Sequence, residues 1–171
     1  MGKWRGWEGR GGLSAIPLWV LLGFFLALSV AEAGARAAPE ERVRGQLLFL
    51  PVYSELPYGD RGAILKFRVL VDIRNLSRQA NISLKQVDYV DDQGRRVREC
   101  LKSARTLGPL ASERLEVLES DRSGGRSSGF MIEWRSAEPV LPPVIQAVMI
   151  FGAYNQGVGL LSEPKVLESW P

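Results

Sequence analysis

The stretch LKFRVLVDIR, residues 65–74, decides the fold through the alternation of its side chains. Every second residue from Leu65 to Ile73 is apolar, and the residues between them are charged except for Leu70. Successive side chains of a β-strand point to opposite faces, whereas a helix requires apolar spacing of about 3.6 residues. The stretch therefore predicts a strand with one buried face and one face in solvent.

Strand signals continue after this stretch and are separated by polar turns. Residues 75–81 predict a connection, and the alternation resumes over residues 82–84. The apolar positions then shift to Val87 and Tyr89, as a β-bulge or a crossing between sheets would produce. The DDQG sequence that follows predicts a tight turn, with a returning strand over residues 95–101.

The remaining sequence repeats this pattern of short strands. Residues 107–110 predict a corner, and residues 114–119 and 130–134 predict strands. Residues 144–151 are almost wholly apolar, which predicts a strand covered on both faces. Helical spacing is hard to find after residue 38. We therefore expect an all-β fold, an antiparallel β-sandwich of immunoglobulin-like arrangement, with a small closed β-barrel as the alternative.

The N-terminus has the layout of a secretory signal peptide. Basic residues precede an uncharged segment at residues 13–31, and small residues follow at Ala31, Ala33 and Ala37. The rival interpretation is an uncleaved membrane anchor, because the segment approaches the roughly 20 residues that a membrane-spanning helix requires. Pro17 and the small residues favour cleavage, after Ala33 or Ala37.

These observations divide the chain into three parts. Residues 1–37 are expected to be a signal peptide or membrane anchor, residues 38–46 a linker, and residues 47–168 a single β-sandwich domain. A length of 171 residues fits one domain. The predicted location is the periplasm or the outside of the cell, or the inner membrane if residues 13–31 remain as an anchor.

The charge of the chain argues against a nucleic-acid partner. The sequence has 22 basic and 19 acidic residues, but residues 1–37 contain four of the basic ones and two of the acidic ones. The exported part therefore carries 18 basic and 17 acidic side chains and is nearly neutral. Nucleic-acid binding requires a basic stripe that displaces counterions from phosphates. The densest basic group, residues 95–98, fits the solvated side of a strand instead.

The residue inventory also disfavours catalysis. The chain contains no histidine, which removes Ser-His-Asp and Cys-His nucleophiles and the commonest transition-metal ligand. Its single cysteine, Cys100, cannot form an intramolecular disulfide and is expected to be a small buried residue. We expect no cofactor and no metal, since Asp88, Asp91 and Asp92 lack the spacing of a calcium loop and fit a solvated hairpin tip.

The sequence DRSGGRSSG, residues 121–129, is the strongest candidate for a site. Arg122, Ser123, Gly124, Gly125 and Arg126 combine positive charge with glycine amides, which could form a concave anion-binding nest. No helix pattern follows the glycines, so a nucleotide-binding loop is excluded. A turn between two strands is the favoured interpretation, and the anion site is the alternative. Ser123 as a nucleophile would require a lysine base, to which no spacing points.

The order of several short motifs resembles an uncharacterised bacterial family catalogued as domain of unknown function 3124. The resemblance covers residues 48 to 161 approximately. It rests on PVYS (51–54), DIRN (72–75), VDY (87–89), DRSGG (121–125), FMIEW (130–134), PPV (142–144) and AVM (147–149). It implies a small exported or membrane-associated bacterial protein and does not supply an activity.

The sequence thus predicts a non-enzymatic binding or accessory module of the bacterial envelope. Its partner would be a protein, a peptide or a glycan, recognised through loops or a sheet edge. The alternative is a binder of small anions or ligands through residues 122–126, and a histidine-independent hydrolase is the remote alternative. A membrane would be contacted only through residues 13–31, if these are not removed.

Overall fold

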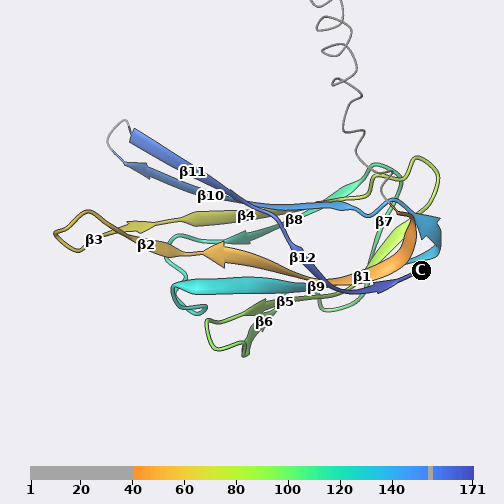
Figure 1. Ribbon diagram of the computed structural model, residues 1–171, viewed down its shortest axis with the longest axis horizontal. Helices are drawn as coiled ribbons and strands as arrows, with labels where there is room; N and C mark the ends of the chain where they lie inside the picture. Colours follow the sequence, from red (N-terminus) through yellow and green to blue (C-terminus); the bar gives the residue numbers. More distant parts are fainter. Residues whose placement is uncertain (1–40, 154–155) are drawn as a thin grey trace, which may run out of the picture. The chain divides into compact units, whose positions relative to one another are not determined.

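A computed structural model describes residues 41–153 and 156–171. The predicted targeting segment lies outside these residues. The described chain is all-β, and its strands form two layers with a projecting hairpin (Figure 1). The strands are β1 (Val43–Tyr53), β2 (Glu55–Tyr58), β3 (Ala63–Lys66), β4 (Arg68–Arg74), β5 (Ile82–Val90), β6 (Arg96–Glu99), β7 (Arg105–Leu107), β8 (Ser112–Val117), β9 (Ser127–Val140), β10 (Val144–Ala153), β11 (Gln156–Ser162) and β12 (Lys165–Trp170).

The strands pair antiparallel throughout, as predicted. One six-stranded sheet has the order β12-β1-β9-β5-β6, with β7 also paired to β5. A four-stranded sheet has the order β11-β10-β4-β8, and β2 and β3 form a separate hairpin. Both larger sheets end in edge strands, so the closed barrel is wrong and the sandwich is confirmed.

The core lies between the two sheets and is built from the alternating positions that the sequence indicates. Phe67, Phe130 and Trp134 are fully buried, as are Val69 and Ile73 of β4. Burying a side chain of this size contributes about 1.5–3 kcal/mol relative to leaving it exposed. The period-two pattern therefore identifies the face of each strand that stabilises the fold.

The strand predicted over residues 65–74 is interrupted at Phe67. Its backbone N–H donates to the carbonyl of Ser54 over 2.9 Å, and its ring is buried. Before Phe67 the chain belongs to β3, which pairs with β2, and after it the chain belongs to β4. One alternating stretch thus serves both the hairpin and the four-stranded sheet.

The prediction that residues 144–151 are covered on both faces is wrong. Ile145, Ala147 and Met149 are buried, but Val148 and Ile150 are 38% and 46% exposed. The outer face of β10 is apolar and faces solvent in the described part of the chain. A run of apolar residues predicts a strand, but it does not predict whether a second layer of the protein covers that strand.

The region around β5 follows the prediction in its backbone. The register between β5 and β9 shifts between Leu84 and Gln86, which is the predicted bulge. Gly94 has a positive φ of 77° in the turn before β6. The predicted solvated acidic tip is wrong for Asp88, which is only 4% exposed and accepts a 2.6 Å hydrogen bond from Gln86.

The folded region also extends beyond the predicted boundaries. β1 begins at Val43, inside the predicted linker of residues 38–46, because Val43 is buried and pairs with Val140. β12 continues to Trp170 rather than ending at residue 168 and occupies the edge beside β1. This placement differs from an immunoglobulin domain, in which the first strand occupies that edge.

Candidate functional site

The predicted site lies in the connection from β8 to β9, at the end of the sandwich from which the β2–β3 hairpin projects (Figure 1). We call this end the hairpin end. The connection is tied to the hairpin by Glu55, the first residue of β2. Residues that are distant in sequence therefore meet here: the predicted loop, the hairpin and the start of β4.

The two glycines of the loop are required by the fold. Gly125 has a positive φ of 71°, which glycine adopts without steric cost. Gly124 is buried, and a Cβ there would lie 2.5 Å from Cζ of Tyr89 and closer still to its hydroxyl oxygen. Tyr89 is itself fully buried and bonded to Ser128 over 2.9 Å. The glycines allow the loop to lie directly on the core.

The polar groups of the loop are largely used within it. Asp121 accepts hydrogen bonds from the backbone N–H and the hydroxyl of Ser123, over 3.0 and 2.6 Å. The N–H of Gly125 donates to the carbonyl of Arg122 over 3.2 Å. The Ser123 hydroxyl, together with Arg98 at 2.9 Å, holds the pKa of Asp121 below its usual value. This geometry is that of a hydrogen-bonded turn, the favoured interpretation of the sequence.

The two arginines converge on one carboxylate. Arg122 and Arg126 lie 3.3 and 3.1 Å from different oxygens of Glu55. The Glu55 side chain is 13% exposed, whereas the arginine side chains are 58% and 69% exposed. Glu55 therefore fixes the two guanidinium groups while leaving most of their surface in solvent. Sequence reasoning missed Glu55 because it lies outside the loop and carries no local motif.

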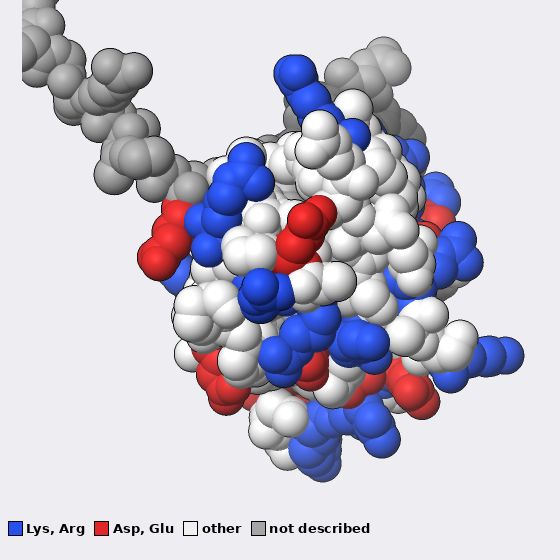
Figure 2. Space-filling model, turned by 90° about the vertical axis from the view of Figure 1, so that its right-hand side faces the viewer, with Lys and Arg blue, Asp and Glu red and all other residues white. Residues whose placement is uncertain are grey.

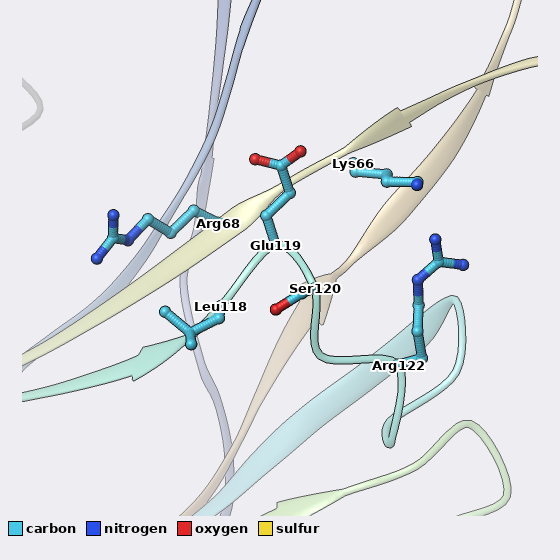
Figure 3. Close-up of a pocket in the computed structure, with 6 residues that line it drawn as sticks. All are labelled: Lys66, Arg68, Leu118, Glu119, Ser120 and Arg122. Atoms are coloured by element: carbon cyan, nitrogen blue, oxygen red, sulfur yellow. The ribbon is translucent and has the colours of Figure 1, made fainter.

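Arg122 also lines an open groove of about 520 Å³ beside the hairpin. The other lining residues are Lys66, Arg68, Leu118, Glu119 and Ser120. Figure 3 shows the Arg122 guanidinium directed toward the ammonium group of Lys66. Arg68 forms an ion pair with Glu116, and no ion pair of Lys66 is found among the described residues. The signal for Lys66 and Arg68 was present in the sequence as the charged face of residues 65–74.

A second, smaller cavity of about 200 Å³ also borders Glu55. It is lined by Glu55, Pro57, Gly62, Ile64 and Arg126. Ile64 is 45% exposed. The hairpin end thus presents a cationic groove and a partly apolar cavity that share the pair of arginines bound to Glu55.

The opposite end of the sandwich has a different character. Figure 2 faces this end and shows basic and acidic side chains interspersed. A cavity of about 340 Å³ is lined there by Arg42, Leu76, Ser77, Arg78, Gln79 and Leu141. Beneath it Asn75 is fully buried and ties the loop from β4 to β5 to the corner after β7.

The described residues provide little catalytic machinery. The Ser123 hydroxyl donates to the carboxylate of Asp121, whose lowered pKa makes it a weak general base. Within residues 41–153 and 156–171, no group of three His, Cys, Asp or Glu side chains could hold a metal ion. Cys100 is half-buried, and burial raises the pKa of its thiol. The described chain also contains no helix long and apolar enough to cross a membrane.

Comparison with known proteins identifies a family. The profile of the family described as protein of unknown function DUF3124 matches residues 45–167. A crystal structure of Thermotoga maritima 1070 is similar with a TM-score of 0.40 and 13% sequence identity, covering 75% of this chain and 97% of that one. No curated protein matches the sequence significantly. Because the family profile spans most of the sequence, the chain belongs to the DUF3124 family.

Proposed function

We propose that this protein is an exported bacterial envelope protein that acts as a non-enzymatic binding module. Its partner is a protein or peptide that presents an acidic segment to the hairpin end. Export is supported by the basic, apolar and small-residue order of residues 1–37. A binding role is supported by the absence of histidine from the sequence and by the engagement of Ser123 with Asp121.

The observation that carries the proposal is the convergence of Arg122 and Arg126 on Glu55. A guanidinium group has five N–H donors, and each arginine donates one hydrogen bond to Glu55, so other donors stay available. Because Glu55 already orders the two side chains, a ligand carboxylate would meet them at a reduced entropic cost. Lys66 adds positive charge to the groove, where Arg68 is paired with Glu116 and Glu119 contributes one carboxylate.

The apolar part of the same end fits a polypeptide. Tyr58 and Ile64 of the hairpin are 64% and 45% exposed, and Arg and Tyr are enriched among residues that dominate binding energies. An acidic segment with one or two apolar side chains would place its carboxylates on the groove and its apolar groups on the hairpin. Complementary charge of this kind governs specificity and the rate of association.

The test is site-specific crosslinking in cells together with a defined titration. A photoreactive residue in place of Tyr58 is expected to yield one discrete adduct. The adduct should be lost in the double variant K66E/R68E. It should still form in the control variant K165E, which changes a residue of β12. A synthetic Glu- and Leu-containing peptide should bind the purified protein, and added salt should weaken this binding. The proposal fails if the peptide binds K66E/R68E as tightly as the wild-type protein.

A second candidate function is the binding of small anions at the same groove, which is lined by three cationic side chains and one carboxylate, Glu119. Inorganic phosphate and acetate distinguish the two candidates. The small-anion site would be established instead by two results together. Phosphate would raise the melting temperature of the wild-type protein but not of R122A/R126A, and the acidic peptide would not bind. The location is tested separately by the mass of the mature protein, which should correspond to cleavage after Ala33 or Ala37.

A further inference from the structure

The edge strand β11 lacks the protection that the other edges of the described sheets carry. Its sequence QGVGLLS contains no charged residue and no proline, and its pairing with β10 runs without a register shift. The other edges carry charges: β8 reads SERLEV, β6 reads RVRE, and β12 reads KVLESW and has a register shift against β1. Natural proteins normally block edge strands with charges, prolines or bulges, because unpaired N–H and C=O groups recruit further strands.

The glycines of this region are not explained by the packing of the single chain. A Cβ at Gly159 would have no atom within 4 Å, and one at Gly157 would lie 3.7 Å from the carbonyl oxygen of Phe151; neither residue is among those with positive φ. Glycine inside a strand weakens it and often marks a place where another backbone approaches closely. The free edge and its glycines therefore both indicate an additional strand at this position.

Apolar side chains lie beside the free edge. Leu161 is 60% exposed and pairs with Val148, which is 38% exposed, while Ile150 pairs with Gly159 and is 46% exposed. A strand added to β11 would cover part of this surface. Its own side chains would have to be apolar as well, because charged groups would be desolvated against leucine and valine.

We propose that β11 pairs antiparallel with β11 of a second copy of the chain, about a two-fold axis at Gly159. In this register Val158 faces Leu160 of the second copy, and Leu161 faces Gly157. Leu161 thus lies opposite a residue without a side chain, Leu160 lies opposite a valine, and no like charges meet. The pairing joins two four-stranded sheets into one continuous sheet across a self-complementary interface. It uses a different surface from the cationic groove and goes beyond the binding function proposed above.

The association state tests this proposal. Sedimentation of the purified full chain over a range of concentrations should show a monomer–dimer equilibrium. L161K should raise the dissociation constant at least tenfold, since it places a charge on the shared edge. V166K is the matched control, because Val166 is 51% exposed on the protected strand β12, and it should leave the equilibrium unchanged.

Disulfide crosslinking tests the proposed register between the two β11 strands. In a C100S background, G159C should form an intermolecular disulfide on mild oxidation, because residues directly opposite across antiparallel strands have Cα atoms about 4.5–5.5 Å apart. V166C in the same background should not. A wild-type protein that remains monomeric throughout overturns the proposal, as does a dimer that is insensitive to L161K and not trapped by G159C. L161K should still bind the acidic peptide. Loss of the dimer can therefore be distinguished from loss of the proposed binding function.

Discussion

Replacing Gly124 by alanine provides a direct test of whether the loop is held against the core. The added Cβ would lie 2.8 Å from Cβ of Ser128 and 2.5 Å from Cζ of Tyr89. Neither neighbour is free to move, because Tyr89 is fully buried and Ser128 is 2% exposed. The Tyr89 ring is also packed against Phe130, with 5.1 Å between ring centroids. The chain must therefore shift the loop or displace the tyrosine.

The expected loss of stability follows from these contacts. Overpacking a core by one methyl group costs about 1–3 kcal/mol, and the rigid neighbours place this site in the upper part of that range. Displacing Tyr89 would also break its 2.9 Å hydrogen bond to Ser128, which is worth about 1 kcal/mol. We expect G124A to lower the free energy of unfolding by about 3 kcal/mol.

Urea unfolding followed by tryptophan fluorescence measures this loss. With a slope of about 2 kcal/mol per molar urea, the midpoint should fall by roughly 1.5 M while the slope stays constant. G152A is the matched control, because a Cβ at Gly152 meets no atom within 4 Å, and it should be neutral or slightly stabilising. Y89F should partly rescue G124A, since it removes the nearest oxygen. Equal midpoints for G124A and G152A would refute the close packing of this loop.

Three further outcomes are expected. N75A should lose about 3 kcal/mol of stability in urea unfolding, because the buried Asn75 amide donates to three backbone carbonyls, whereas N81A at an exposed position should change it by less than about 0.5 kcal/mol. The pKa of Asp121 is lowered in the folded state, so its contribution to stability is present above about pH 4 and is lost as pH falls; midpoints measured from pH 6 to pH 3 should fall more steeply for the wild-type protein than for D121N. Cys100 should react with a disulfide reagent more slowly in the folded protein than in urea, because burial raises the pKa of its thiol, and equal rates would contradict this.

The sequence predicts those parts of the fold that depend on neighbouring residues. Alternation identifies β4, the parity change after Leu84 identifies the bulge, and the DDQG turn places a positive φ at Gly94. The break at Phe67 is invisible in the sequence because it depends on the carbonyl of Ser54, a non-local partner. Val148 is exposed because no second layer covers it within the described residues, and an apolar run in the sequence does not indicate whether such a layer exists.

The candidate site divides in the same way. The loop with Arg122 and Arg126 stands out locally through its glycines and charges, and the structure brings these two arginines together. Glu55 gives no such signal, because its role arises only when the β2–β3 hairpin folds back beside the loop. Lys66 was recognisable as an outward-facing charge but not as a wall of a groove. Local sequence patterns therefore indicate candidate side chains, but which side chains contact one another is determined by the tertiary fold.

The pairing of β1 with β12 constrains the order in which the domain can form. Gly45 lies opposite Trp170, and the Arg135 guanidinium stacks on the Trp170 ring with 3.2 Å to its centroid. A chain is synthesised from its N-terminus onward, so β1 appears well before its partner β12. The six-stranded sheet can therefore be completed only after β12 has been released. Slow release of β12 would leave the edge of β1 unpaired, so that a strand of another chain could pair with it first.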